Sequence, residues 1–266
     1  MTSAIHLDLT DKAAFVSGGA AGIGRTIARS LMAQGAEVLI SDIDGKALSD
    51  FLASHPLAKG IEADAASWPD TQKVFSEIQS TMGRLDILIN NAGVAGPIAI
   101  VEEIELDEWD RTLAVDINGA FYCTKLAVPM IRKSGGGSII NIASNAAFFG
   151  VPLRSPYAAA KWAMVGLTKT WAMELGTDGI RVNALCPGSV SGPRIDAVIQ
   201  KDADLRGMEP EQIRDIYKRQ NSMHLLMEPE DVAAMAVFLC SNAGSKISGQ
   251  AIGVDGHTEG FGSTFQ

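Results

Sequence analysis

The fold of this chain is decided by residues 13–24, AAFVSGGAAGIG. The apolar residues 13–16 predict a short buried strand, and a helical pattern follows the glycines as far as Gln34. Gly18, Gly22 and Gly24 suit a tight turn, a close approach to pyrophosphate and close packing of the helix. Phosphate would then rest on the N-terminus of that helix. A glycine cluster between a strand and a helix therefore predicts a dinucleotide site, whereas the same cluster elsewhere would be an ordinary turn.

The alternation of strand and helix continues from this stretch to the end of the chain. Helical patterns are expected at 44–54, 67–82, 105–133, 156–177 and 229–241. Further strands are expected at 37–41, 60–63, 85–89, 138–143, 180–186 and 251–254. With no linker or repeat between them, these elements predict an α/β fold: one doubly wound parallel sheet flanked by helices, in a single domain over residues 1–266.

Two segments stand apart from this alternation. Residues 189–221 are polar, charged and helical in pattern, and they are too long for a plain connection. We expect them to form a substrate-loop insertion that acts as a mobile lid. The glycine-rich tail, 260–266, carries two phenylalanines and suggests a subunit contact.

Composition narrows the classes of partner. The chain has 266 residues, 47% of them hydrophobic, and a net charge of −9. A globular protein with one large core is expected, and the negative field disfavours nucleic acid and anionic membranes as partners. The three widely spaced cysteines are most simply reduced core thiols. Residues 1–10 have neither the basic start nor the apolar core of a signal peptide, so a cytoplasmic protein without a membrane segment is expected.

The second strand carries information about the cofactor. It ends at Asp42, 18 residues beyond Gly24. A carboxylate there can accept a hydrogen bond from an adenosine ribose 2′-OH and would repel a 2′-phosphate. Asp44 adds negative charge, and the glycine turn contains no Lys or Arg. NAD is therefore predicted over NADP, while Asp44 can also cap the following helix.

A second constellation suggests proton transfer. Tyr157 and Lys161 lie four residues apart in a helical pattern, so they share one face of the helix. A neighbouring ammonium lowers the pKa of a phenol from its usual value of about 10. Ser144 follows the strand 138–143 and lies at the carboxyl end expected of a ligand site. The trio suits conversion of an alcohol to a ketone, although the same Tyr–Lys spacing also occurs as an exposed pair without chemistry.

These residues belong to a wider set of motifs. The set comprises SGGAAGIG (17–24), Asp64, NNAG (90–93), Asn118, Ser144, YAAAK (157–161) and PG (187–188). In this order and spacing, the chain resembles the classical short-chain dehydrogenases/reductases over essentially its whole length. The resemblance implies a seven-stranded Rossmann sheet, usually in a homotetramer. The cofactor predicted from Asp42 remains NAD, and no metal site is predicted.

The resemblance also implies a catalytic tetrad of Asn118, Ser144, Tyr157 and Lys161. Tyr157 would be the general base in alcohol oxidation or the acid in ketone reduction, Lys161 would lower its pKa and hold the nicotinamide ribose, and Ser144 would fix the substrate oxygen. Asn118 would keep a water in the proton path. Because Asn118 interrupts a helical pattern and precedes Gly119, it predicts a local kink or a bound water, with a satisfied core amide as the alternative.

The expected cofactor site is drawn from the ends of several strands. Ser17 replaces the Thr usual in the glycine motif and keeps the hydroxyl. Gly192 stands where a Thr often binds the carboxamide, so we expect that contact to pass to the backbone of Val190 or to Ser191. The expected cofactor residues are Gly18, Ala21, Gly22, Ile23, Gly24, Asp42, Ile43, Asp64, Ala65, Asn91, Ala92, Gly93, Tyr157, Lys161, Pro187, Gly188 and Val190.

Substrate specificity is expected from the loops at 94–100, 145–156 and 189–221. Arg154 and Arg194 could clamp an anionic group, or they could pair with acids or face solvent. Phe149 could line an apolar pocket. The leading hypothesis is an NAD-dependent oxidoreductase that interconverts a secondary alcohol (a sugar, polyol, hydroxy acid or cyclic alcohol) and its ketone. The alternatives are a 3-oxoacyl-carrier-protein-type ketoreductase and a non-catalytic dinucleotide sensor.

Overall fold

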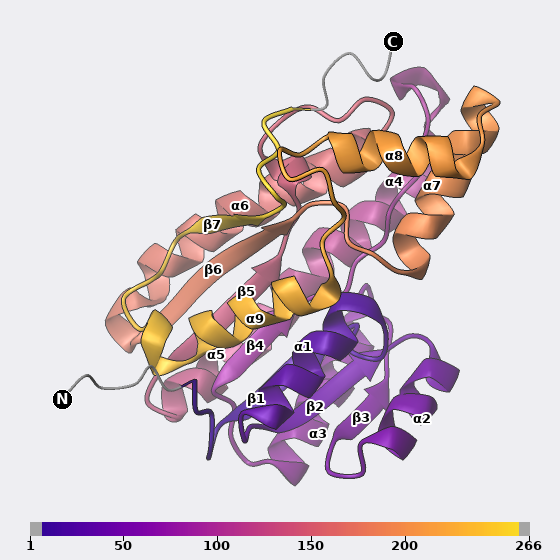
Figure 1. The fold of residues 1–266 in the computed structure, drawn as a ribbon. Helices are drawn as coiled ribbons and strands as arrows, with labels where there is room; N and C mark the ends of the chain where they lie inside the picture. The colour runs from indigo at the N-terminus through magenta and orange to yellow at the C-terminus, as the bar shows by residue number, and fades with distance from the viewer. Residues whose placement is uncertain (1–6, 261–266) are drawn as a thin grey trace.

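Seven parallel strands form one sheet in the order β3-β2-β1-β4-β5-β6-β7 (Figure 1). The structure is a computed structural model, and it describes residues 7–260. No strand bound differs from its prediction by more than two residues. The strands are β1 (Ala13–Ser17), β2 (Glu37–Asp42), β3 (Lys59–Glu62), β4 (Ile87–Asn90), β5 (Gly137–Ile142), β6 (Ile180–Pro187) and β7 (Ala251–Val254).

Helices cover both faces of this sheet, as the doubly wound pattern predicts. On one face α1 packs beside α9, and on the other α3 packs beside α5. None of the described helices is long and apolar enough to cross a bilayer. The helices are α1 (Gly22–Ala33), α2 (Gly45–Ser54), α3 (Trp68–Thr81), α4 (Leu106–Leu113), α5 (Gly119–Lys133), α6 (Ser155–Leu175), α7 (Pro193–Arg206), α8 (Pro210–Arg219) and α9 (Pro229–Cys240).

The core is divided between the two faces because successive side chains of a strand point in opposite directions. In β1, Ala14 and Val16 belong to the cluster that includes α1 and α9, whereas Phe15 belongs to the cluster under α3, α5 and α6. All three side chains are fully buried. This two-sided burial explains why the strands read as continuous apolar runs.

The long helical pattern at 105–133 is interrupted in its middle. Between α4 and α5 the backbone forms a π-helical segment, η2 (Ala114–Asn118). Such single-turn insertions rotate the residues that follow and are frequent at functional sites. The local irregularity predicted from Asn118 is therefore present, as a π-helical segment rather than a sharp kink.

The segment 189–221 contains two helices, α7 and α8. They pack on each other through a small cluster of Ile199, Ala203 and Ile213, separate from the main core. Figure 1 shows this pair above the carboxyl ends of the strands. That α7 and α8 act as a mobile lid remains a prediction. The expected subunit contact at 260–266 lies, apart from Gly260, outside the described residues.

Candidate active site

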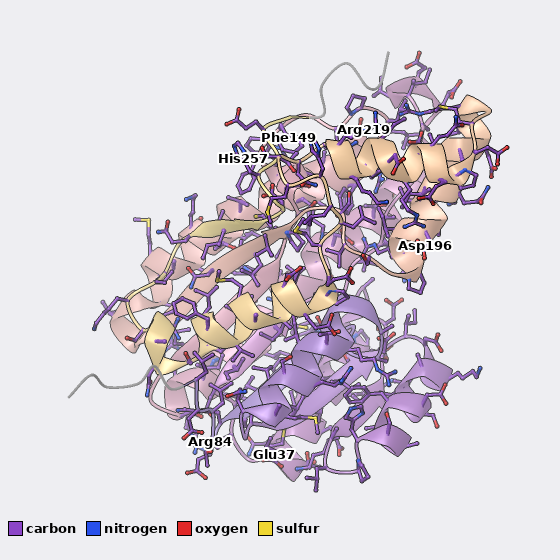
Figure 2. The ribbon with its side chains drawn as sticks, in the orientation of Figure 1. Glu37, Arg84, Phe149, Asp196, Arg219 and His257 are labelled. Carbon is purple, nitrogen blue, oxygen red and sulfur yellow. The ribbon has the colours of Figure 1, made fainter. Side chains whose placement is uncertain are left out.

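The loops that follow six of the strands enclose a cavity of about 570 Å³. Because all strands are parallel, their carboxyl ends meet at one edge of the sheet, and the strand order reverses between β1 and β4. A crevice at this switch point is where open α/β sheets bind ligands. Figure 2 places Phe149, Asp196 and His257 toward this end of the molecule and Glu37 and Arg84 at the opposite end.

Every residue predicted to contact the cofactor lines this cavity. Residues from the turn after β1 meet others from the ends of β2, β3, β4 and β6. Their contacts with a bound cofactor remain predictions. The lining includes Gly18, Ala21, Gly22, Ile23, Gly24, Asp42, Ile43, Asp64, Ala65, Asn91, Ala92, Gly93, Tyr157, Lys161, Pro187, Gly188 and Val190.

The N-terminus of α1 fits a pyrophosphate. Helix α2 is capped by the Asp44 carboxylate and α3 by the Ser67 hydroxyl. By contrast, α1 has no side-chain cap and no acidic residue in its first turn, so its free N–H groups and positive dipole end face the cavity. Gly22 has φ +51°, and apart from its chain neighbours and the backbone of its own helix no described atom lies within 4 Å of the place where a Cβ would stand. The uncapped helix end and the open glycine surface leave room for an anion.

Ser17 joins the glycine turn to the end of β4. Its Oγ accepts hydrogen bonds from the backbone N–H groups of Asn91 and Ala92, both at 3.1 Å. The Asn91 amide in turn donates to the carbonyl of Gly18 at 2.8 Å. A Cβ on Gly24 would lie 2.1 Å from that same carbonyl oxygen, so only glycine lets the helix pack there. The Ser17 hydroxyl thus joins the turn after β1 to the end of β4.

Asp42 is held in a fixed position at the end of β2. Its Oδ2 accepts from the backbone N–H of Ala20 at 3.0 Å, and its Oδ1 accepts from that of Asp44 at 3.1 Å. A second acid, Asp64, pairs with Arg111 at 2.9 Å, and both line the cavity. Burial alone would raise the pKa of Asp64, but the hydrogen bonds from Arg111 and the Ala66 amide hold it below its usual value. No motif had singled out Arg111.

Ser144, Tyr157 and Lys161 come together at the centre of the cavity. Tyr157 and Lys161 lie on one face of α6, and Lys161 Nζ is 5.4 Å from the centre of the Tyr157 ring. Lys161 also donates to the carbonyl of Ile142 at 3.3 Å. Burial raises the pKa of Tyr157, but Lys161, Arg194 and a hydrogen bond with Ser144 outweigh it, so the pKa lies below the usual value for a phenol. The arrangement favours the phenolate form of Tyr157, which can accept a proton.

Asn118 does not join this group, contrary to the prediction. It is exposed and does not line the cavity. Residues two apart in a helix do not share a face, so with Val115 and Asp116 buried, Asn118 is left on the outer side. The polar group from this helix that faces Lys161 is the carboxylate of Asp116, at 3.1 Å. No residue pattern had pointed to Asp116.

Two arginines line the cavity near Tyr157. The Arg154 guanidinium stacks over the Tyr157 ring at 4.8 Å and donates to the carbonyl of Ala95 at 2.7 Å. Arg194 donates to the carbonyl of Gly93 at 3.3 Å. Within residues 7–260, neither guanidinium has a carboxylate within ion-pairing distance. Burial and the neighbouring charge of Arg194 lower the pKa of Arg154, although nearby Tyr157 acts in the opposite direction.

Phe149, the third residue predicted for the substrate, does not line the cavity. After Ser144 the chain makes a 3₁₀ turn, η3 (Asn145–Ala147), which redirects the loop. The wall is instead formed by Val151, Pro152 and Leu153, which follow in the same loop.

Comparison with known proteins agrees with this architecture. A family model described as enoyl-(acyl carrier protein) reductase matches residues 18–258. D-beta-hydroxybutyrate dehydrogenase of Cupriavidus necator is 33% identical over 93% of this chain and 98% of its own. 2,5-Dichloro-2,5-cyclohexadiene-1,4-diol dehydrogenase of Sphingobium indicum is 35% identical over 94% of this chain and 97% of its own.

A solved structure extends the similarity to three dimensions. L-sorbose reductase from Gluconobacter frateurii, complexed with NADPH and L-sorbose, superposes with a TM-score of 0.89. It shares 26% identity and covers 96% of this chain and 99% of its own. The relatives thus act on a hydroxy acid, a cyclic diol and a ketose.

Proposed function

The chain belongs to the short-chain dehydrogenase/reductase family, and we propose that it oxidises a secondary alcohol to the ketone, or the reverse, with NAD as hydride carrier. That it is an oxidoreductase acting on an alcohol or ketone follows from its relatives. The observation that carries the proposed chemistry is the group of Ser144, Tyr157 and Lys161 in the cavity, with the pKa of Tyr157 lowered.

Each side chain of this group has a distinct task. The Tyr157 phenolate accepts the hydroxyl proton during oxidation, and the phenol returns it during reduction. Ser144 holds the substrate oxygen beside Tyr157, and Lys161 stabilises the phenolate by its charge. A bound nicotinamide supplies hydride transfer, which is the cofactor's own chemistry.

The preference for NAD rests on Asp42. Its carboxylate is fixed by two backbone N–H groups and lines the cavity at the end of β2. A ribose 2′-OH can donate to it, whereas a 2′-phosphate would meet an immobile negative charge. The relative solved with NADPH shows that the other cofactor occurs in similar proteins, so the proposed preference rests on Asp42 and not on family membership.

Arg154 and Arg194 favour a substrate with an anionic group. Two guanidinium groups with no carboxylate partner in the described part of the chain line the cavity near Tyr157, where we place the substrate. A guanidinium fork matches a carboxylate through paired hydrogen bonds. A hydroxy acid is therefore the preferred candidate, ahead of neutral sugars, polyols and cyclic alcohols.

The active form is proposed to be a homotetramer.

The test is reduced nicotinamide formation from NAD⁺ and NADP⁺ with a panel of hydroxy acids, their neutral methyl esters, sugars, polyols and cyclic alcohols. We expect NAD⁺-dependent turnover, fastest with an acid rather than its ester. A 3-oxoacyl-carrier-protein-type ketoreductase would instead prefer NADPH and thioester substrates. A sensor would bind cofactor and turn over nothing, which would contradict the proposed function.

The arginines are tested by comparing the kcat/KM of each acid with that of its ester. Arg154→Gln and Arg194→Gln should each lower that ratio by about 10-fold or more, because a charge-assisted pair is lost. Arg111→Gln is the matched control, since it removes a guanidinium from the adenosine end of the same cavity and should leave the ratio unchanged. An unchanged ratio in both of the first two variants would exclude anion recognition by these residues.

A further inference from the structure

Asp116 is a buried carboxylate directly beside the predicted acid–base group. Its Oδ2 lies 3.1 Å from Lys161 Nζ, with 0% of the Asp116 side chain and 5% of the Lys161 side chain exposed. Its Oδ1 accepts a hydrogen bond from the backbone N–H of Val94 at 2.7 Å. Asp116 therefore ties Lys161 to the loop that follows β4.

The neighbouring glycine shows how closely these groups are packed. A Cβ on Gly93 would stand 3.3 Å from Asp116 Oδ1 and 3.4 Å from Lys161 Nζ. Apart from Lys161, the Oδ2 atom has no partner among the described residues. The carboxylate thus depends on Lys161 for compensation of its charge, since burying an unpaired carboxylate is costly.

We propose that Asp116, and not Asn118, is the group from the α4–α5 helix that completes this site, as a positioning residue that holds Lys161 and moderates its charge. The inference rests on the proposed function in taking Tyr157 as the acid–base group. A carboxylate here differs in kind from the amide of the expected tetrad, because it carries a charge opposite to that of Lys161.

The charges around Tyr157 give this difference a measurable consequence. Lys161 faces it from its own helix, Arg154 from the preceding turn and Arg194 from α7, and all three are cationic. Asp116 is the anion in this set. Asp116 raises the pKa of Tyr157, whereas the cations lower it. A neutral residue at 116 removes the charge that opposes Lys161 and should therefore lower the pKa of Tyr157 further.

The experiment is a spectroscopic titration of Tyr157 in the protein without substrate. Phenolate absorbs in the near ultraviolet, and the chain has three tyrosines, so subtraction of the Tyr157→Phe curve isolates the Tyr157 signal. Asp116→Asn should lower the midpoint by about 0.5 to 1 pH unit. Asp116→Glu, which keeps the charge, should stay near the wild-type midpoint.

Asn118→Ala is the matched control and should leave the midpoint unchanged. A midpoint that moves with Asn118→Ala, or fails to move with Asp116→Asn, would overturn the assignment, and so would equal shifts for Asp116→Asn and Asp116→Glu. Asp116→Ser supplies a second neutral variant that is smaller than the native side chain. Because the titration needs no turnover, a protein that oxidised nothing in the panel would contradict the proposed function and leave this test intact.

Discussion

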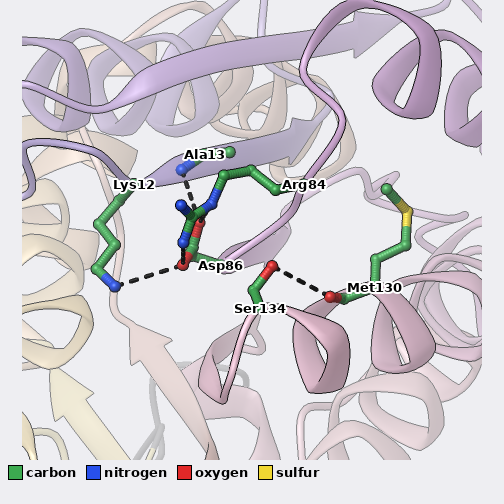
Figure 3. A network of polar contacts seen from close by, with 6 residues as sticks. All are labelled: Lys12, Ala13, Arg84, Asp86, Met130 and Ser134. Carbon is green, nitrogen blue, oxygen red and sulfur yellow. Dashed lines mark hydrogen bonds and ion pairs between the residues drawn. The ribbon is translucent and has the colours of Figure 1, made fainter.

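Two buried carboxylates lie at opposite ends of β4, and they differ in the number of groups that compensate their charge. Asp86 directly precedes β4 and is 2% exposed, whereas Asp116 contacts the loop directly after β4 and is 0% exposed. Figure 3 shows Asp86 surrounded by Arg84, Lys12 and the backbone N–H of Ala13. Both of its oxygens accept hydrogen bonds, from Arg84 at 2.7 and 2.9 Å and from Ala13 at 3.0 Å.

Among residues 7–260, Asp116 forms an ion pair with Lys161 alone, and Lys161 is a predicted functional group. This difference in the number of cationic partners distinguishes a structural site at the amino end of the sheet from a functional site at its carboxyl end. At the amino end, the Asp86 carboxylate pairs with two cations, Lys12 and Arg84, whose side chains are both half exposed. Such duplicated ion pairing is typical of a structural site. The carboxyl end leaves Lys161 shared between Asp116 and Tyr157, so a change at either residue should alter the chemistry of the other.

The largest expected effect is a loss of folding stability when Asp86, the structural carboxylate, is replaced. Asp86→Ala should lower the free energy of unfolding by about 3 kcal/mol, because it leaves the buried Ala13 N–H and the Arg84 fork without an acceptor. Urea denaturation measures this loss. The Tyr157 titration midpoint should be unchanged, and a shifted midpoint would show that the two ends of the sheet are not independent.

The next effect concerns the carboxylate at the end of β2. Asp42→Ala should reduce the ratio of kcat/KM with NAD⁺ to that with NADP⁺ by about 10- to 100-fold, through loss of a charged hydrogen bond and of repulsion toward the 2′-phosphate. Steady-state kinetics with both cofactors test this, with Asp44→Ala as the neighbouring control. A ratio unaffected by Asp42→Ala would remove the argument for NAD.

A smaller effect is expected from the cations around Asp86. Arg84→Met should cost about 1 kcal/mol of stability and Lys12→Met less, since both side chains are half exposed and only the arginine binds with two hydrogen bonds. Chemical denaturation of the two variants checks the order. Equal losses would mean that hydrogen-bond geometry has no influence on stability at this site.

The smallest effect is a change in pH dependence. Arg194→Gln should raise the pKa of Tyr157, because a cation that lowers it is removed. Oxidation requires the phenolate and therefore increases as pH rises through that pKa, so the rising limb of the rate should move to higher pH, by about 0.5 unit. The shift is opposite in sign to that of Asp116→Asn, and shifts of the same sign would contradict the charge balance.

The sequence predicted the sheet because burial on two faces leaves long apolar runs, and each run matched a strand. The glycines and acids expected at strand ends do line the cavity, since strand ends lie at one edge of a parallel sheet, and their binding of a cofactor stays a prediction. Arg111 and Asp116 could not be found in this way. Asp116 and Asn118 lie two residues apart and so on different faces of the helix, and the motifs in the sequence did not show that Asp116 is the one facing Lys161.

Proton transfer by Tyr157 is tested most directly by the pH dependence of NAD⁺-dependent alcohol oxidation in wild-type protein and in Tyr157→Phe. The wild-type rate should rise with pH along a limb below the usual phenol pKa of about 10. The Phe variant should lose that limb and at least about two orders of magnitude in kcat, with cofactor affinity nearly unchanged. A variant that kept both the rate and the limb would show that Tyr157 does not transfer the proton.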